Sequence, residues 1–203
     1  MVSGEKVDYK KRDRELYRQS TSPTVVDVPE MNFITVDERG SPDSEVMATA
    51  MATIYSLTYA IKMKGKELPG YFEYVILPPE GLWWNFDKPT PDEWRWTVMM
   101  RQPEFVTQKV FEWAKDLVGN KPGTDTSKAE FRTVEEGRCM QMLHVGPYSD
   151  IHPGAISKLV DCIESKGYAV DMNGGRKYHE IYFSDPHKVE ESKLKTLIRL
   201  PIK

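Results

Sequence analysis

The amino-acid sequence places strand-like and helix-like segments in an order that occurs twice, and this duplication limits the fold more than any other feature. The first series has a strand near 33–36, a helix at 41–65, and strand segments at 71–77, 82–86 and 94–100. The second has a hairpin at 131–145 that turns near Gly137, a helix at 152–167, and strands at 177–183 and 194–200. The repeated order predicts two similar half-domains.

The longest predicted helix, 41–65, has apolar residues at the spacing of one helical face. Ser41 and Pro42 suit its start, and Gly65 suits its end. The residues of this face are Met47, Ala50, Met51, Ile54, Thr58 and Ile61. A further helix at 104–118 joins the half-domains, and we expect an α+β fold of two pseudo-symmetric strand-helix-strand-strand units with antiparallel sheets around a central ligand groove.

Residue identities support the repeat, because "YFEYVILPP" and "YHEIYFSDP" align without a gap. The alignment matches Tyr71 with Tyr178 and Glu73 with Glu180. Flanking matches occur in the same order: "MKG" with "SKG" upstream, and "MMRQP" with "LIRLP" downstream. If the half-domains pair about a twofold axis, Glu73 and Glu180 are expected to face one cleft.

Glu180 stands in the middle of an aromatic, strand-like run, "KYHEIYFSDP". Because successive side chains of a strand point to opposite faces, Tyr178, Glu180 and Tyr182 share one face of the predicted strand. An acid between two phenols is compatible with a solvated surface and with a binding site, and the pattern alone does not separate the two.

Composition excludes several classes of protein. The 203 residues carry a net charge of -3, which gives no general attraction to phosphate backbones, so direct nucleic-acid binding is not expected. Neither Cys139 nor Cys162 has a zinc or redox spacing, and the four histidines form no metal-binding motif. No signal peptide or membrane-spanning run is found, so we expect a cytoplasmic protein without membrane contact, a metal or a cofactor.

Residues 1–24 are polar and mixed in charge, and we expect an N-terminal arm that packs on the domain through Tyr9, Leu16 and Tyr17. Residues 25–203 are then a single domain of two repeats, at about 25–103 and 128–203. We expect a monomer or a weak dimer.

Seven motifs in order resemble the GyrI-like small-molecule-binding proteins, the stand-alone relatives of the effector-binding domain of multidrug-sensing transcription activators. The motifs are "KKRDRELY", "VPEMNFITVDERGSPDS", "YSLTYAIKMK", "PPEGLWW", "WRWTVMMRQPEFVT", "HVGPY" and "YHEIYFSDP". The resemblance implies that Glu180 lies in the groove and meets flat hydrophobic or cationic ligands. It also implies that the chain hydrolyses the strained cyclopropane of DNA-alkylating compounds, as some stand-alone members do. Glu80 departs from the family pattern and is expected to be solvated.

That chemistry needs a base beside a water molecule and a donor for the charge released onto a carbonyl. We expect Glu180 or Glu73 as the base, in a coupled pair, and Tyr178 as the donor. Adjacent Trp83 and Trp84 point to opposite faces, so at most one reaches the groove, and tryptophans are more often core residues. The candidates for ligand contact are Tyr71, Trp83, Trp84, Trp96, Tyr148, Tyr182, Met51 and Tyr55.

Three functions from different classes remain open at this point: a hydrolase of cyclopropane-bearing toxins, a multidrug-binding protein that sequesters lipophilic cations without turnover, and a ligand sensor that acts through a protein partner. Catalytic turnover separates the first from the other two.

Overall fold

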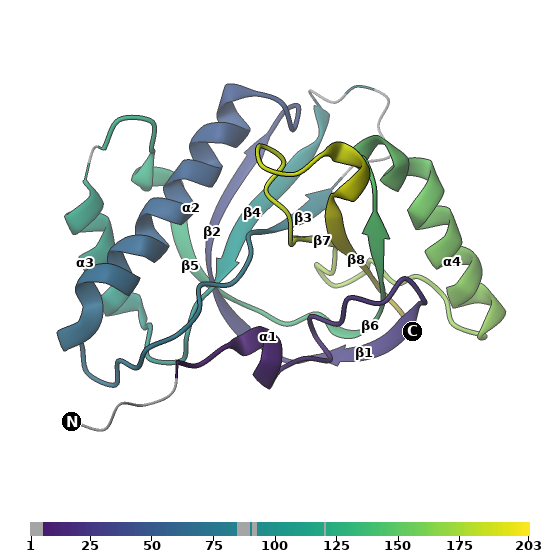
Figure 1. The fold of residues 1–203 in the computed structure, drawn as a ribbon, viewed down its shortest axis with the longest axis horizontal. Helices are drawn as coiled ribbons and strands as arrows, with labels where there is room; N and C mark the ends of the chain where they lie inside the picture. The colour runs from purple at the N-terminus through teal and green to yellow at the C-terminus, as the bar shows by residue number, and fades with distance from the viewer. Residues whose placement is uncertain (1–5, 85–89, 91–92, 120) are drawn as a thin grey trace.

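A computed structural model describes residues 6–84, 90, 93–119 and 121–203. One antiparallel sheet of eight strands forms its centre (Figure 1). The strands are β1 (Thr24–Val28), β2 (Met31–Arg39), β3 (Glu80–Trp84), β4 (Arg95–Arg101), β5 (Ala129–Val134), β6 (Gly137–Val145), β7 (Tyr178–Tyr182) and β8 (Lys195–Pro201). The predicted strand at 82–86 ends outside the described residues.

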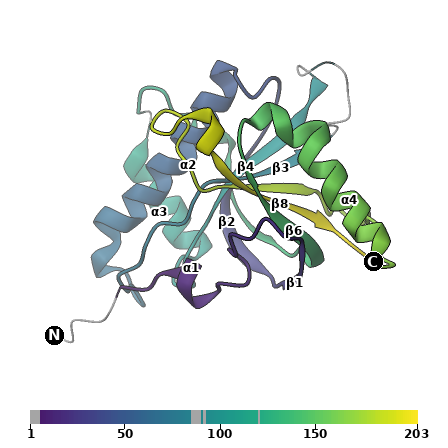
Figure 2. The same ribbon diagram turned by 45° about the vertical axis from the view of Figure 1, so that its right-hand side comes forward.

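The helices lie over the two halves of the sheet. Helices α2 (Glu45–Lys64) and α3 (Gln108–Val118) pack side by side on one half, and α4 (Ile156–Ser165) lies on the other (Figures 1 and 2). A short helix, α1 (Tyr9–Arg12), belongs to the N-terminal arm. No helix of the described residues is long and apolar enough to cross a membrane.

The sheet is pseudo-symmetric about its middle. From one edge the strands are β1-β6-β8-β7, and from the other edge their counterparts follow in the same order, β5-β2-β4-β3. One half is built from β2, α2, β3 and β4, and the other from β6, α4, β7 and β8. The predicted strand, helix, strand, strand repeat and the α+β fold class are therefore confirmed. The two halves meet where β3 pairs with β7.

The strand that precedes each half in the sequence pairs with a strand of the other half. Strand β1 pairs with β6, and β5 pairs with β2. The predicted hairpin at 131–145 is therefore wrong, because β5 and β6 lie in different halves and do not pair. Gly137 still turns the chain, with φ 64°, a backbone conformation that favours glycine. The chain crosses between halves there instead of folding back on itself.

The symmetry also corrects the alignment of the repeats. Strand β7 occupies one side of the central pair and β3 the other, so the structural counterpart of β7 is β3. The segment at 71–77, predicted as a strand, forms only an isolated bridge from Tyr74 to Val7. Matching Glu73 with Glu180 is therefore wrong, although the duplication itself is real.

The two faces of the sheet carry different layers. Cross-strand register places Trp83, Tyr178 and Glu180 on one face, since residues two apart on a strand share a face. Helix α2 packs on that same face, where Val36 and Glu38 meet it. The other face carries His179, Arg199 and Gln141, and the N-terminal arm covers it. Tyr9, Leu16 and Tyr17 of the arm are buried.

Local signals explain the helix ends. The Ser44 hydroxyl accepts a hydrogen bond from the Met47 amide (3.3 Å) and begins α2. The Thr107 hydroxyl caps α3 in the same way, so this helix begins at Gln108 and not at 104 as predicted. Buried residues of α2 recur at helical spacing, with Ile54, Leu57 and Ile61 at 0 % exposure.

Replacement of Leu57 by alanine tests this packing. Because Leu57 is fully buried, the cavity left by Leu57→Ala is expected to lower the free energy of unfolding by about 2–5 kcal/mol in denaturant titrations. Lys64→Ala, on an exposed position of the same helix, is the control and should change it by less than about 0.5 kcal/mol. Equal effects of the two substitutions would contradict the observed orientation of α2.

Candidate functional site

Three side chains donate hydrogen bonds to the carboxylate of Glu180. The Tyr178 hydroxyl lies 2.6 Å from Oε1, and the Tyr182 hydroxyl lies 2.6 Å from Oε2. Across the seam between the halves, the Trp83 indole Nε1 lies 3.1 Å from Oε2. The side chains of Glu180, Tyr178, Tyr182 and Trp83 are called the Glu180 cage below. Glu180 is 7 % exposed, so the surface-acid alternative is excluded.

Glycine at position 81 makes the cage possible. Gly81 pairs with Glu180 across the seam, and a Cβ atom there would lie 2.8 Å from the Tyr182 hydroxyl and 3.1 Å from Trp83 Nε1. These contacts are closer than carbon normally approaches oxygen or nitrogen. Any side chain at this position would displace the two groups that donate to Oε2.

Burial dominates the ionisation of the cage. Desolvation raises the pKa of Glu180 above its ordinary value, although the bonds from Tyr178, Tyr182 and Trp83 act in the opposite direction. Desolvation and the Glu180 charge raise the pKa of both tyrosines well above 10, so both keep their protons. Glu180 is thus a carboxylate more basic than one in water, surrounded by fixed donors.

Two partly exposed tyrosines, Tyr148 and Tyr55, lie outside the cage. Tyr148, 40 % exposed, meets the Tyr182 ring edge to face, with 5.9 Å between centroids. Tyr55 of α2 is 37 % exposed and stacks on Tyr59 at 6.3 Å. Burial raises the pKa of both tyrosines, and the negative charge of Asp185, in the loop after β7, raises it further.

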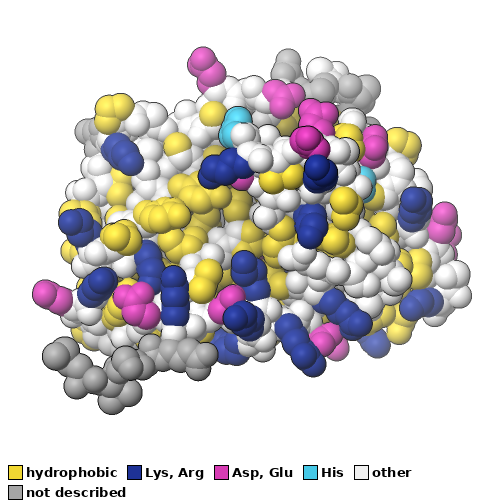
Figure 3. Space-filling model, viewed as in Figure 1, with side chains coloured by type: hydrophobic (Ala, Val, Ile, Leu, Met, Phe, Trp, Pro, Cys, Tyr) yellow, Lys and Arg dark blue, Asp and Glu magenta, His cyan; other side chains and the backbone are white. Residues whose placement is uncertain are grey.

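Hydrophobic side chains gather on one face of the molecule (Figure 3). Figure 3 shows them over α2 and toward the middle, with Lys and Arg side chains around them. An apolar surface of this kind suits a flat hydrophobic molecule.

The other predicted ligand contacts lie elsewhere. Trp96 is 1 % exposed and donates to the Gly40 carbonyl (3.0 Å), so it belongs to the core. Trp84 points away from the cage, as expected from its neighbour Trp83, and Lys177 lies over its ring at 5.3 Å. Met51 is half-buried and packs against the core.

Glu73 and Tyr71 form a separate group at the end of α2. Glu73 is exposed and pairs with Lys62, and the Tyr71 hydroxyl donates to it at 3.0 Å. The pKa of Glu73 is lowered, first by its hydrogen bond with Lys62. The pKa of Glu180 is instead raised by burial.

The prediction of a coupled pair of carboxylates is therefore wrong. Its physical reason is the misaligned repeat: Glu73 follows α2 in an irregular segment, while the strand opposite Glu180 is β3. At the position across from Glu180 the chain has Gly81, not a second acid.

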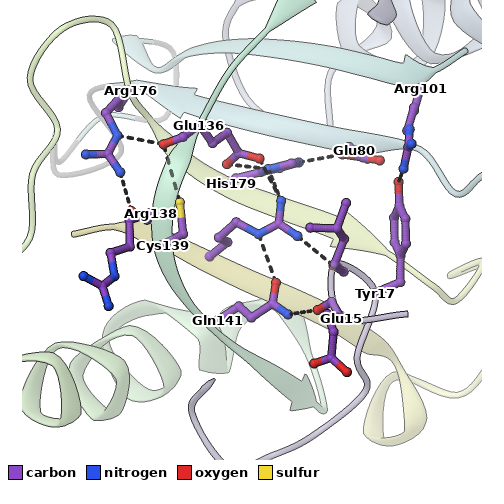
Figure 4. A network of polar contacts seen from close by, with 12 residues as sticks. Glu15, Tyr17, Glu80, Arg101, Glu136, Arg138, Cys139, Gln141, Arg176 and His179 are labelled. Atoms are coloured by element: carbon purple, nitrogen blue, oxygen red, sulfur yellow. Dashed lines mark hydrogen bonds and ion pairs between the residues drawn. The ribbon is translucent and has the colours of Figure 1, made fainter. Parts of the chain in front are cut away.

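A second polar cluster, drawn in Figure 4, lies on the opposite face of the sheet, because His179 and Glu180 are neighbours on β7 and point to opposite faces. His179 is fully buried, with Nδ1 3.0 Å from Glu136 Oε2 and Nε2 2.9 Å from Glu80 Oε2. The contact between His179 and Glu80 is an ion pair. Arg199, 1 % exposed, holds the other Glu136 oxygen at 2.7 Å. We call Glu80, Glu136, His179 and Arg199 the buried charge cluster.

The charges of the buried charge cluster balance, because it contains two carboxylates and two cationic side chains. Burial alone would lower the pKa of His179, but Glu136 and Glu80 outweigh it and raise that pKa to about 9. Burial likewise opposes ionisation of Glu136, but His179 and Arg199 lower its pKa to about 2. The expectation that Glu80 is solvated is wrong, since it is 1 % exposed. Beside His179, its charge has a partner that the sequence pattern did not show.

The N-terminal arm closes the cluster from outside. Arg199 donates from Nη2 to the Leu16 carbonyl (2.7 Å) and from Nε to the Gln141 side chain (3.0 Å). Gln141 in turn donates to the Glu15 carbonyl at 2.7 Å. Arg101 bonds the Tyr17 hydroxyl and Asp13 beside it. Backbone carbonyls of the arm thus satisfy donors that would otherwise be buried without partners.

Sequence reasoning missed Gly81, His179 and Glu80. An isolated glycine within a strand pattern indicates close backbone approach, and "EGLWW" contains that signal. The alternation of β7 also places His179 opposite Glu180, but its partners come from β3 and from the turn before β6. No local pattern links those segments.

A hollow of about 260 Å³ lies between α2 and β2, and none of the cage residues lines it. Its lining includes Glu38, Asp125 and Lys128, and its walls contain no aromatic side chain. Among the described residues, no group of His, Cys, Asp and Glu side chains is arranged to hold a metal ion.

The fold and the cage define a class of protein: a duplicated domain whose two halves enclose a carboxylate among aromatic donors at their seam. Residues 21–203 match the family model of the GyrI-like small molecule binding domain, and the chain belongs to this family. It is therefore a small-molecule-binding GyrI-like domain, as the sequence motifs indicated. A comparison with curated proteins gives no match.

Solved structures agree with this assignment. A crystal structure of a hydrolase from Listeria innocua is 41% identical, with a TM-score of 0.88 over 98% of this chain and 100% of that one. An uncharacterized conserved protein from Listeria innocua is 42% identical, with a TM-score of 0.90 over the same shares. The C-terminal domain of EcmrR shares the fold at 14% identity, with a TM-score of 0.53 over 90% of this chain and 97% of that one.

The buried charge cluster predicts a specific dependence of stability on pH. Because the pKa of His179 rises from 6.5 to about 9 on folding, its contribution is complete below pH 6.5 and is lost as the pH rises through 9. The loss is on the order of 3 kcal/mol in the free energy of unfolding. Denaturant titrations from pH 6 to 10 measure it. His179→Gln should abolish this slope, and an unchanged slope would contradict the assignment.

Gly81→Ala tests the close approach at the cage. The added Cβ should push the Tyr182 hydroxyl and the Trp83 indole from Glu180, because both lie within 3.1 Å of its position. The Trp83 indole N–H resonance should then shift upfield as its hydrogen bond is lost, and the free energy of unfolding should fall by about 1–3 kcal/mol. Gly154→Ala is the control, since nothing lies within 4 Å of its Cβ position. An indole resonance that stays in place would argue against the cage.

Proposed function

We propose that the protein hydrolyses flat, hydrophobic electrophiles, namely DNA-alkylating compounds that carry a cyclopropane conjugated to a carbonyl. The observation that carries the proposal is the buried carboxylate of Glu180, held by three donors and raised in pKa by desolvation. The 41% identity to a Listeria innocua hydrolase, over 98% of the chain, supports hydrolysis as the class of reaction.

In the proposed step, the oxygen of a water molecule attacks the unsubstituted cyclopropane carbon, and Glu180 takes the proton of that water. The carbon–carbon bond of the ring breaks, and its electron pair moves through the conjugated system to the carbonyl oxygen. That oxygen takes a proton from a tyrosine hydroxyl, which recovers one from Glu180. The net reaction adds water and opens the strained ring, so the product no longer alkylates DNA.

The cage supplies a role for each group. Glu180 is the base, since desolvation makes its carboxylate more basic. Tyr182 is half-buried and its ring touches exposed Tyr148, and we assign its hydroxyl the transfer of a proton to the product. Tyr178 is 1 % exposed and holds the other carboxylate oxygen. Tyr148 and Tyr55 are the surfaces on which a flat substrate stacks.

Turnover of a cyclopropane-bearing DNA alkylator, followed as ring-opened product, tests the proposal. Removal of the base by Glu180→Gln should lower kcat/KM by about 100-fold or more. Glu73→Gln is the matched control, because this exposed acid lies outside the cage, and it should retain activity. Product formation no faster than in buffer would refute the hydrolase proposal for that substrate class.

The pH dependence adds a second readout. Because the base must be ionised, kcat/KM should fall on the acid side at a pH above the ordinary glutamate pKa of 4.5. Tyr178→Phe removes a hydrogen bond that lowers the pKa of Glu180, so the acid limb should move to still higher pH. An acid limb that stays in place in Tyr178→Phe would show that another group is the base.

Sequestration of lipophilic cations is the second candidate, and the exposed ring of Tyr148, which meets Tyr182 of the cage, favours it. Aromatic faces and a desolvated counter-charge both attract a delocalised cation. A rhodamine dye should then bind with a Kd on the order of micromolar, weakened about tenfold or more by Glu180→Gln. Equal affinities, measured by fluorescence anisotropy, would exclude Glu180 as the counter-charge.

A further inference from the structure

The residue that precedes Glu180 has no part in the proposed reaction, yet it is fully buried and charged. His179 points to the opposite face of β7, because side chains alternate along a strand. Both of its ring nitrogens face carboxylates, Glu136 at 3.0 Å and Glu80 at 2.9 Å. A ring with an acid at each nitrogen is best satisfied when both nitrogens carry protons, which makes it an imidazolium.

The partners of His179 come from elements that also build the cage. Glu80 belongs to β3 and immediately precedes Gly81, the residue opposite Glu180. An ion pair from His179 to Glu80 therefore joins β7 to β3 one residue away from the Glu180 and Gly81 pair. The donors to Glu180 come from both strands, Tyr178 and Tyr182 from β7 and Trp83 from β3.

Spacing between the two strands decides whether the cage forms. The ladder between β3 and β7 has four register pairs, from Glu80 with Ile181 to Trp83 with Tyr178. Trp83 Nε1 reaches both the Glu180 carboxylate and the Tyr182 hydroxyl at 3.1 Å. A small sliding or separation of the strands would break both contacts, since hydrogen bonds weaken steeply with distance and angle.

Glu180 and His179 differ in the charge of the groups that surround them. Glu180 faces the neutral donors Tyr178, Tyr182 and Trp83, with Tyr148 beyond them, and it has no cation in its cage. His179 faces Glu80 and Glu136, with Arg199, Arg101, Tyr17 and Cys139 around those acids. The positive charge of His179 acts on Glu180 through the sheet.

We propose that His179 is a positioning residue for Glu180: its ion pairs fix β3 against β7 beneath the cage, and its positive charge favours the ionised carboxylate. This role rests on the proposed function of Glu180. The buried charge cluster thereby has two effects. It balances its own charges, and it favours the ionised form of Glu180 on the other face of the sheet. The N-terminal arm takes part through the carbonyl of Leu16, which holds Arg199 in the cluster.

The test measures the ionisation of Glu180 directly, by carbon NMR of glutamate side chains in the full chain, assigned with Glu180→Gln. His179→Gln should raise the titration midpoint of Glu180, because a favourable positive charge is lost. It should also shift the Trp83 indole N–H resonance. His187→Gln makes the same chemical change at an exposed loop position and should change neither signal.

A second variant guards against loss of folding. His179→Gln leaves one acid of the cluster unbalanced, whereas the double variant His179→Gln with Glu136→Gln removes opposite charges and keeps the buried balance. The Glu180 midpoint should rise in the double variant as well. A midpoint equal to that of His187→Gln in both variants would overturn the proposal.

Turnover separates this proposal from the proposed function. If the wild-type protein opens no cyclopropane substrate while the Glu180 midpoint still rises in the His179 variants, hydrolysis fails and the positioning role is supported. If turnover occurs, the acid limb of kcat/KM should move to higher pH in the double variant by the same interval as the NMR midpoint. An acid limb that does not move would overturn the positioning role.

Discussion

Four residues of β3 pair with four of β7, and this short ladder joins the two halves of the sheet. The cage depends on it, because Glu180 takes two donors from its own strand and one from the other. The buried charge cluster depends on it too, because His179 and Glu80 meet across the same ladder. A duplicated fold thus produces an asymmetric centre, in which β7 contributes the acid and β3 contributes the glycine that makes room.

The two faces of this ladder bury charged groups in different ways. On the face beneath, two carboxylates and two cationic side chains are buried together, so each charge has a partner, and these partners raise the pKa of His179 and lower that of Glu136. On the helix face, one carboxylate is buried with neutral donors only, which leaves it more basic than in water. A buried acid without a cation costs stability, and such an arrangement is typical of a functional site.

The periodicity of the sequence predicted the fold well, because the local signals are strong. Examples are the apolar face of α2, the aromatic run of β7, and the order of elements that both half-domains share. Pairing was harder. The predicted hairpin failed because β5 and β6 exchange halves, and Glu73 was matched with Glu180 because residue identity outweighed topology in the alignment. Tyr178 and Tyr182 follow from strand alternation alone, whereas Glu80 and Gly81 need the cross-strand register, which no local pattern contains.

The chain belongs to a family of small-molecule-binding domains, and we propose the cage as its ligand site. A crystal structure of the protein with a bound rhodamine dye tests this most directly. We predict that the dye lies over the β3 and β7 ladder, against Tyr148 and Tyr55, with its nearest charged neighbour Glu180. A dye bound instead in the hollow between α2 and β2, beside Glu38 and Lys128, with the cage unchanged, would contradict the account.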